Sequence, residues 1–335
     1  MSVKDSVLKI LSESKAEGGF VSGQELAEKC GVSRTSVWKA VEALRKSGAA
    51  IEAVTNNGYR LIKSNVFDKN SIQALIDGTL GVSVDFFETI DSTNAEAKRR
   101  MLGAERNSLH KTAIVASSQT AGRGRLGRSF ASPQNTGVYL SVIFTRGDFS
   151  NPALFTANAA VAVCRALRSV FAVEAKIKWV NDVFVNGKKV CGILTEGIAD
   201  FETGRIDFAV VGIGVNILNS AALPQDVAGG ILREDGDVPL RRSELSAAII
   251  SEMVRIIEGG AQAQKSAMEE YRARSLLIGQ QIEFSPVIGE EKQNFTCTVK
   301  DVTPDAKLLV QLADGTEKRL ESGEVSIYSE KVCYN

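Results

Sequence analysis

The Asn186-Gly187 dipeptide is the feature that most restricts how this chain can fold. It lies between two β-rich runs, at residues 176–185 and 189–197, and a third run follows at 206–217. Asn-Gly between two such runs predicts a tight β-hairpin, whose strands are antiparallel. The sequence therefore predicts a sheet that is at least partly antiparallel and excludes a doubly wound parallel sheet.

The glycines of the third run do not restore a dinucleotide-binding fold. Residues 211–216 read Val-Gly-Ile-Gly-Val-Asn, and Ile217 stands where the third glycine of the dinucleotide fingerprint belongs. That glycine lets a helix pack closely on its strand, so its replacement argues against a Rossmann domain.

The rest of the central region mixes strands with helices. The expected strands are 84–87, 113–117 and 137–145, and the expected helices follow Asp91-Ser92-Thr93-Asn94 and cover 158–170. Thr93 with Glu96 fits a capping box, so helix capping is an alternative explanation of Ser92-Thr93-Asn94. No apolar run approaches the length of a membrane span and no apolar signal segment marks the start, so we expect no membrane partner.

The amino-terminal residues predict a winged helix-turn-helix domain over 1–65. Ser22 with Glu25 forms a capping box, Ser33 begins the next helix, and Asn56-Asn57-Gly58 predicts the hairpin of a wing. The order of helix, turn, helix and hairpin is that of DNA-binding domains of this type. The DNA-binding candidates lie at the start of the recognition helix: Arg34, Thr35, Ser36, Trp38 and Lys39. A small helical module that binds protein is the alternative.

Short strands dominate the carboxy-terminal residues, at 296–302, 307–312 and 317–320, with a turn at Asp314-Gly315. They predict a small β-barrel over 275–335. With a linker at 64–69, the α+β chain divides into 1–65, a central mixed-sheet α/β domain over 66–274, and 275–335.

Composition limits the chemistry. The 40 basic residues balance 40 acidic ones, so the net charge gives no indication of a nucleic-acid partner. Residues 1–63 alone have a modest positive excess, with ten Lys/Arg against seven Asp/Glu. Five dispersed cysteines (Cys30, Cys164, Cys191, Cys297 and Cys333) predict reduced thiols in a cytoplasmic protein. His110 is the only histidine, which argues against histidine zinc sites and a Ser-His-Asp triad. We expect it at a surface turn.

Residues 122–128 read Gly-Arg-Gly-Arg-Leu-Gly-Arg and lie between two expected strands. Glycines let the backbone approach a ligand, and guanidinium groups suit carboxylate and phosphate. The loop therefore predicts an anion site, with a structural loop or a nucleic-acid segment as the alternatives. Two weaker signals follow, the polar end of Lys178-Trp179-Val180-Asn181-Asp182 and the lysine pair before Val190. Alone, the first is typical of a turn and the second of a solvated hairpin edge.

The combination and order of these motifs resemble the bifunctional biotin–protein ligases that also act as biotin operon repressors. The matching segments are 91–94, Gln119 with 122–128, 178–182, 189–194 and 212–216. The resemblance covers nearly the whole chain and implies a ligase domain like that of class II aminoacyl-tRNA synthetases with an SH3-like carboxy-terminal barrel. This chain has Val180 where members of the family often have proline. It has Ser129-Phe130 after the arginine-glycine loop, where some members have a tryptophan.

The resemblance implies an enzyme that converts biotin and MgATP to biotinoyl-5′-AMP and transfers biotin to a lysine of the biotin carboxyl carrier protein. No protein cage for metal is implied. The implied catalytic residues are Arg125, Lys189 and Asp182. The implied biotin site is Ser92, Thr93, Asn94, Gln119, Arg123, Gly124, Arg125, Lys189 and Gly192. The implied nucleotide site is Arg128, Lys178, Asn181, Asp182 and Asn216.

The resemblance also implies regulation, with the adenylate as co-repressor of a homodimer on operator DNA. Three other interpretations stay open: a ligase whose winged helix does not regulate, a biotin-sensing repressor without ligase activity, and a lipoate or octanoate transferase. The arginine-glycine loop and the winged helix favour biotin over lipoate.

Overall fold

The computed structural model describes residues 2–15, 19–46, 48–103, 106–199, 206–220, 222–223, 228–232, 240–286, 294–321 and 323–327. The chain forms two compact units: Met1–Leu75 with Asp235–Ala247, and Ile76–Glu234 with Ala248–Asn335.

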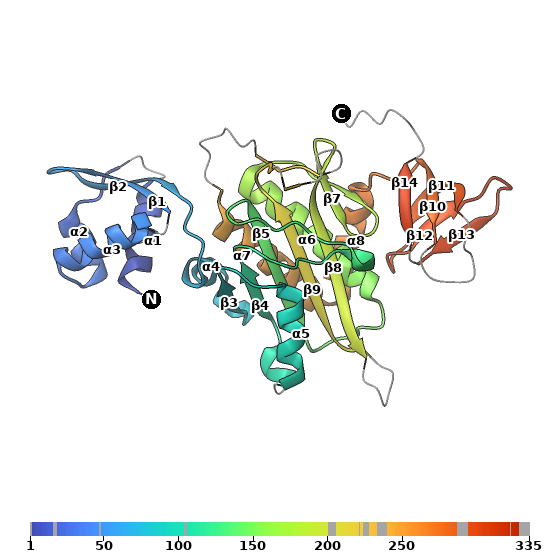
Figure 1. The fold of residues 1–335 in the computed structure, drawn as a ribbon, viewed down its shortest axis with the longest axis horizontal. Coiled ribbons are helices and arrows are strands. Elements are labelled where there is room, and N and C mark those ends of the chain that lie inside the picture. Colours follow the sequence, from blue (N-terminus) through green and yellow to red (C-terminus); the bar gives the residue numbers. More distant parts are fainter. Residues whose placement is uncertain are drawn as a thin grey trace. The chain divides into compact units, whose positions relative to one another are not determined.

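The amino-terminal unit, blue in Figure 1, contains the expected three helices and hairpin. Its elements are α1 (Val3–Lys15), α2 (Gly23–Cys30), α3 (Arg34–Lys46), β1 (Ala49–Val54), β2 (Gly58–Ser64) and α4 (Lys69–Leu75). Ser22 Oγ accepts a hydrogen bond from Glu25 N at 3.1 Å and Ser33 Oγ accepts one from Ser36 N at 3.2 Å, so both predicted helix starts are confirmed. Gly31 ends α2 in the left-handed region, at a φ of 65°.

The expected linker at 64–69 is not a free segment. Val66 is buried in the core of the amino-terminal unit, together with Leu26, Val41 and Leu44. Apolar side chains at this point bury themselves against the helices, so the chain packs here before α4 begins.

The second unit is built on a seven-stranded mixed sheet in the order β3-β4-β5-β9-β8-β7-β6. Its strands are β3 (Ser83–Phe87), β4 (Thr112–Ala116), β5 (Gly137–Phe144), β6 (Lys176–Lys178), β7 (Asp182–Val185), β8 (Lys188–Ala199) and β9 (Ile206–Asn216). Only β3 and β4 among these pair in parallel, which confirms the predicted antiparallel character.

The Asn186-Gly187 hairpin is confirmed, since both residues have positive φ, 48° and 75°, and join β7 to β8. The prediction of one strand over 176–185 is wrong. That run divides into β6 and β7, because Trp179–Asn181 forms a turn that contains a cis peptide bond between Trp179 and Val180. The turn brings the polar residues Lys178, Asn181 and Asp182 together at one end of the sheet.

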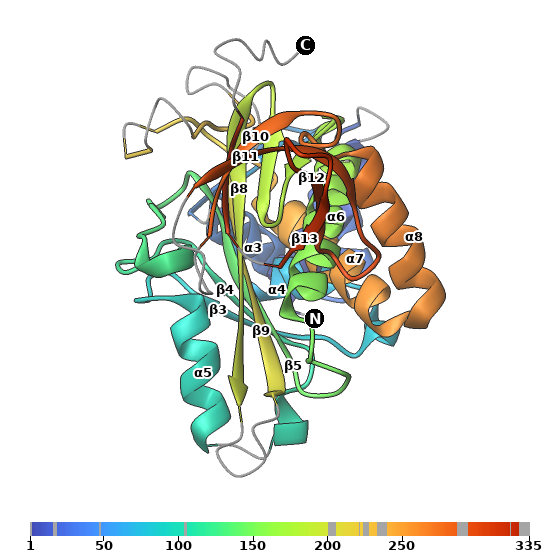
Figure 2. The ribbon, with the colours of Figure 1, turned by 90° about the vertical axis from the view of Figure 1, so that its right-hand side faces the viewer.

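Helices cover both faces of this sheet (Figure 2). Helix α5 (Thr93–Gly103) lies on one face, and α6 (Pro152–Phe171), α7 (Arg242–Glu258) and α8 (Gly260–Ala273) lie on the other. Strand β5 is buried on both sides along its whole length because it lies between these layers. Short 3-10 turns occur at Gly78–Leu80, Arg106–Leu109 and Arg125–Gly127.

Helix α6 corrects the expectation that no apolar run approaches the length of a membrane span. It is the one helix in the described ranges that is long and apolar enough by composition, at 20 residues with a mean hydropathy of 1.3. However, 72% of that stretch is buried inside the fold. The apolar surface of α6 is therefore used in the core of the protein, against β8 and β9.

The carboxy-terminal residues form a five-stranded antiparallel sheet in the order β13-β12-β11-β10-β14, red in Figure 1. Its strands are β10 (Gln281–Ser285), β11 (Phe295–Val302), β12 (Leu308–Gln311), β13 (Glu317–Leu320) and β14 (Glu324–Ile327). The three predicted strands are confirmed. The first and last were missed, although Ile282 and Phe284 alternate with polar residues as a half-buried strand requires.

His110 is not the surface residue that was expected. It follows a 3-10 turn, but its side chain is only 6% exposed. Its Nδ1 accepts a hydrogen bond from Thr145 N at 3.2 Å, and its Nε2 lies 3.3 Å from Glu258 Oε1. Burial lowers the pKa of His110, and the nearby Glu258 carboxylate partly opposes that effect.

The described cysteines are free thiols, as expected for Cys30, Cys164, Cys191 and Cys297, and Cys333 lies outside the described residues. Burial raises the pKa of the Cys164 thiol to about 12. The buried cysteines are therefore poor nucleophiles. The cytoplasmic location stays a prediction.

Candidate active site

A cavity of about 450 Å³ lies at one end of the seven-stranded sheet. Its wall combines the first turn of α5, the arginine-glycine loop, the ends of β6 to β9, and part of β14. All but one of the predicted ligand-binding residues line it: Ser92, Thr93, Asn94, Gln119, Arg123, Gly124, Arg125, Arg128, Lys178, Asn181, Asp182, Lys189 and Gly192. Segments up to about a hundred residues apart in the chain therefore meet here as predicted.

Asn216 is the exception. It ends β9 opposite Gly137, it is 5% exposed, and it does not line the cavity. Its carbonyl accepts a hydrogen bond from Ile231 N at 3.3 Å, so its backbone holds the following segment. The strand instead contributes Gly212, Ile213 and Gly214 to the cavity wall.

The first turn of α5 sits directly on the sheet because Gly212 has no side chain. A methyl group on Gly212 would overlap the Asn94 amide. Gly212 pairs with Ser141 of β5 on one side and with Leu194 of β8 on the other. Asn94 bonds to both neighbours, accepting from Ser141 Oγ at 2.6 Å and donating to Leu194 O at 3.2 Å.

Gln119 is held in one orientation. Its Oε1 accepts from Thr93 N at 2.9 Å, and its Nε2 donates to Ser132 Oγ at 2.8 Å. These bonds also correct the capping-box interpretation of Thr93 with Glu96. Thr93 is the first helical residue, and the cap is Ser92, whose Oγ lies 3.4 Å from Ala95 N.

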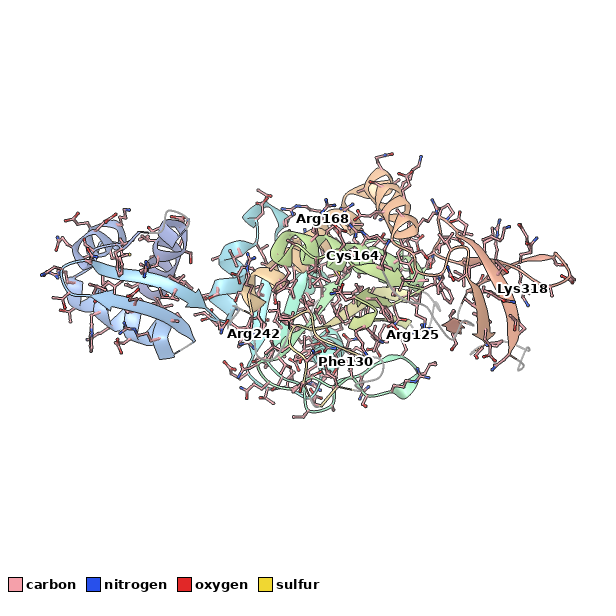
Figure 3. The ribbon with its side chains drawn as sticks, turned by 90° about the horizontal axis from the view of Figure 1, so that it is seen from above. Arg125, Phe130, Cys164, Arg168, Arg242 and Lys318 are labelled. Atoms are coloured by element: carbon pink, nitrogen blue, oxygen red, sulfur yellow. The ribbon has the colours of Figure 1, made fainter. Side chains whose placement is uncertain are left out.

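Backbone hydrogen bonds join the two sides of the arginine-glycine loop. Gly124 N donates to Arg128 O at 2.7 Å, and Phe130 N donates to Gly122 O at 2.9 Å. Arg125, labelled in Figure 3, reaches across the cavity and donates from Nη1 to Asn181 Oδ1 at 3.0 Å. Arg123 and Arg128 are exposed on the same loop. The loop therefore brings three guanidinium groups to one side of the cavity.

Lys189 and Asp182 face each other across the β7–β8 hairpin. Lys189 Nζ lies 2.7 Å from Asp182 Oδ1, and both side chains are about three-quarters buried. Among the described residues that line the cavity, five are cationic (Arg123, Arg125, Arg128, Lys178 and Lys189) and Asp182 is the one carboxylate. The cavity is thus built for an anionic ligand.

Phe130 supplies an apolar wall. A methyl group on Gly214 would overlap its ring, and one on Gly192 would lie 3.2 Å from its Cε2. The ring packs edge-on against Tyr139, with ring centroids 6.4 Å apart. Phenylalanine therefore fills the aromatic position near the loop and rests directly on two strand glycines.

Sequence reasoning missed the contribution of the carboxy-terminal sheet. Gly323, Val325 and Ser326 line the cavity, and Arg125 Nη2 lies 3.5 Å from Gly323 O. No recognisable motif marks these residues. Trp179, Ile193 and Leu194 also line it, and for these the adjoining motif residues were the available signal.

The predicted DNA-binding residues lie in the amino-terminal unit. A groove of about 670 Å³ runs between α3 and the hairpin, lined by Arg34, Thr35 and Trp38 together with wing residues 53–56. Trp38 is 54% exposed, which is unusual for a large aromatic side chain. Lys39 is exposed on α3 but does not line the groove. Ser36 does not line it either, and its Oγ lies 3.0 Å from Ser33 Oγ.

Both compact units contain a segment that matches a known protein family. Residues 86–216 match the Biotin/lipoate A/B protein ligase family and residues 6–60 match an HTH domain. The Bifunctional ligase/repressor BirA of Bacillus subtilis is 39% identical over 209 residues, which cover 61% of this chain and 62% of that protein. The chain thus spans slightly less than two thirds of this Bacillus relative. The protein of the same name from Salmonella typhimurium is 30% identical over 319 residues, which cover 94% of this chain and 95% of that protein.

A solved structure supports the fold of the second unit. A mutant form of the biotin protein ligase from Aquifex aeolicus, in complex with biotin, is 25% identical with a TM-score of 0.57 and covers 73% of this chain and 97% of that chain. The fold of this chain therefore agrees with the sequence matches. The chain therefore belongs to the biotin/lipoate protein ligase family, and within it to the bifunctional ligase/repressors that carry a helix-turn-helix domain.

Proposed function

We propose that the protein is an ATP-dependent biotin–protein ligase that forms biotinoyl-5′-AMP and transfers biotin to a lysine of a biotin carboxyl carrier protein. The observation that carries the proposal is the division of one cavity into two chemistries. The oriented amides Asn94 and Gln119 form one part of its wall, and the other part holds five cationic side chains and the Asp182 carboxylate, which pairs with Lys189. Biotin adenylate has a neutral, hydrogen-bonding ring at one end and an anionic phosphate toward the other.

The amide end fits a ureido ring. Asn94 Nδ2 donates into the protein, to Leu194 O and to Glu196 Oε2. Its Oδ1 accepts from Ser141 Oγ at 2.6 Å and keeps a second lone pair that could accept from a ligand N–H. A ureido group offers N–H donors and a carbonyl acceptor, whereas the dithiolane ring of lipoate offers neither. A site built to bond such groups discriminates strongly against a ligand that lacks them. This favours biotin over a lipoate or octanoate substrate.

The cationic end fits adenylate formation. A carboxylate oxygen of biotin attacks the α-phosphorus of ATP, the new C–O–P link forms, and pyrophosphate leaves with the electrons of the broken P–O bond. Arg125 and Lys189 would neutralise the two approaching anions, so that positioning and electrostatics supply most of the rate. No protein nucleophile is required.

Mg²⁺ would arrive with ATP as part of that substrate. Within the described ranges no three His, Cys, Asp or Glu side chains are grouped to hold a metal ion. Asp182 is the one carboxylate among the described lining residues, which fits an ion bound mainly by phosphate oxygens and water. Asn181 beside it adds a neutral oxygen donor.

Transfer requires a neutral lysine amine on the carrier. Its nitrogen attacks the biotinoyl carbonyl, an amide forms, and AMP leaves. Asp182, which pairs with Lys189, would orient the amine or accept its proton. Its present partner, Lys189, would then turn toward the phosphate.

We also propose repression of transcription, with the adenylate as co-repressor of a homodimer. The exposed Trp38 and Arg34 beside a wing support contact with operator DNA. A ligase whose winged helix does not regulate, and a biotin sensor without ligase activity, remain the alternatives. We further propose a winged helix over 1–65, a class II synthetase-like central domain over 66–274, and an SH3-like barrel over 275–335.

The test is ATP-dependent transfer of biotin to a purified carrier domain, with lipoate as the competing acid. Transfer of biotin with release of AMP and pyrophosphate is expected. Binding of biotin without transfer would support the sensor alternative, and transfer of lipoate would overturn the substrate assignment.

A further inference from the structure

A connected set of polar side chains lies behind the cavity wall, outside the chemistry described above. Glu196 of β8 lies between Lys98 and Asn94, both of helix α5. Its Oε1 accepts a hydrogen bond from Lys98 Nζ at 2.7 Å, and its Oε2 accepts one from Asn94 Nδ2 at 2.8 Å. Asn94 lines the cavity, whereas Lys98 and Glu196 do not.

This arrangement determines which way the Asn94 amide points. Nδ2 faces two groups that can only accept, the Glu196 carboxylate and the Leu194 carbonyl. Oδ1 faces Ser141 Oγ at 2.6 Å and lies over Gly212 of the cavity wall. A flipped amide would place its oxygen against a carboxylate, so only one orientation satisfies every partner.

The carboxylate is the stronger of the two acceptors for Nδ2. The bond to Glu196 is shorter, at 2.8 Å against 3.2 Å for Leu194 O, and a charged acceptor strengthens a hydrogen bond. Only 26% of the Lys98 side chain and 25% of the Glu196 side chain are exposed. An unpaired carboxylate at that depth is costly, so the ion pair with Lys98 holds Glu196 in place.

We propose that Glu196, held by Lys98, is a positioning residue that fixes the Asn94 amide so that the cavity presents an acceptor to a ligand N–H. Glu196 touches no ligand and acts through Asn94. The inference rests on the proposed function in one respect, that the ligand is biotin. Its structural part, the fixed amide, stands on the hydrogen bonds alone.

The test measures biotin affinity by calorimetry in Glu196→Ala, Asn94→Ala and the double variant. Glu196→Ala is expected to weaken biotin binding on the order of tenfold, or about 1.4 kcal/mol. The KM for ATP should stay within about twofold, because Glu196 does not line the cavity and acts through Asn94 rather than through a cationic side chain. In the Asn94→Ala background, Glu196→Ala should cost nothing further, since its effect passes through that amide.

Rescue separates positioning from a merely structural role. Glu196→Gln keeps an acceptor for Asn94 but turns its NH₂ group toward Lys98, so biotin affinity should fall. Adding Lys98→Met removes that unpaired cation and should restore most of the affinity. Asp85→Asn is the matched control, because Asp85 pairs with Arg100 of the same helix away from the cavity. It should leave biotin affinity unchanged.

A measurement without ligand distinguishes failure of this inference from failure of the proposed function. Hydrogen exchange of the Asn94 side-chain NH₂, followed by NMR in the full chain, should be slow in the parent and fast in Glu196→Ala. Fast exchange in the parent, additive losses in the double variant, or an equal loss in Asp85→Asn would each overturn the positioning role. A parent with slow exchange that binds no biotin would overturn the substrate instead.

Discussion

The indole nitrogen of Trp179 donates a 2.8 Å hydrogen bond to the carbonyl oxygen of Ala306. Trp179 lines the cavity, and Ala306 precedes strand β12 of the carboxy-terminal sheet. Tyr271 OH lies 3.3 Å from Val180 O in the same turn. The turn that carries Asn181 and Asp182 is therefore held from two directions, by a helix and by the last sheet.

Arg125→Ala should slow adenylate formation by about 10²–10³-fold, because one preorganised donor to a developing oxyanion is worth that much. Asn181 would also lose its partner across the cavity. Pyrophosphate release in single-turnover reactions measures the effect. Arg168→Ala is the control, since Arg168 is exposed on α6 and pairs with Glu174. Equal losses in the two variants would contradict a specific role for Arg125.

Asp182→Ala should slow transfer to the carrier more than it weakens biotin binding. In the proposed mechanism this carboxylate meets the carrier amine, and in the structure it contacts Lys189 rather than the Asn94 and Gln119 amides. Single-turnover transfer from preformed adenylate gives the transfer rate, and equilibrium binding gives the affinity for biotin. Equal loss in both would remove the proposed role in orienting or deprotonating the amine.

Gly214→Ala should weaken binding of the adenylate and destabilise the protein by about 1–3 kcal/mol, because the methyl group overlaps the Phe130 ring. Denaturant unfolding and ligand binding check both parts. Gly78→Ala serves as the control, since a methyl group there meets no atom within 4 Å. A Gly214→Ala protein as stable as Gly78→Ala would show that Phe130 relaxes freely.

The stability of the protein should fall as pH drops below about 6.5, partly through His110. Its pKa is lowered by burial, so the unfolded chain binds a proton at a higher pH than the folded chain does. The stability that neutral His110 contributes is fully present above its pKa in the unfolded chain and is lost as pH falls through its pKa in the folded chain. His110→Gln should flatten this part of a melting-temperature profile between pH 7 and 5. An unchanged profile would assign that loss to carboxylates alone.

Arg34→Ala should weaken operator binding roughly uniformly across sequences and reduce the salt slope by about one unit, if this side chain contacts phosphate. Trp38→Ala should instead change sequence preference, because its exposed ring lines the groove between α3 and the wing. Binding titrations at several salt concentrations separate the two effects. Lys9→Ala, on the exposed side of α1, should change neither quantity.

Several elements of this fold can be predicted from short local sequence patterns. Asn186-Gly187 requires two positive φ values and so determines the hairpin that brings the side chains of Asp182 and Lys189 into contact. The Ser22 and Ser33 caps likewise mark helices that depend on neighbouring residues alone. Such features can be predicted because each needs only a few consecutive residues.

The missed features depend on partners far along the chain. His110 looks like a turn residue until Glu258, 148 residues later, comes to lie beside its ring. Asn216 resembles a polar strand end, yet pairing with β5 and the segment at Ile231 buries it away from the cavity. Ser326 carries no motif, and its place in the wall follows only from how β14 packs. Tertiary packing, rather than local preference, decided these positions.

The position of Gly323, Val325 and Ser326 in the cavity wall has a consequence for synthesis. The first wall residue, Ser92, leaves the ribosome early, but the wall lacks its last members until β14 has been made. The most recently joined residues of a nascent chain stay inside the ribosomal exit tunnel. The cavity can therefore be completed only after β14 has left that tunnel, and a product cut short before β14 would carry every recognisable motif without an enclosed site.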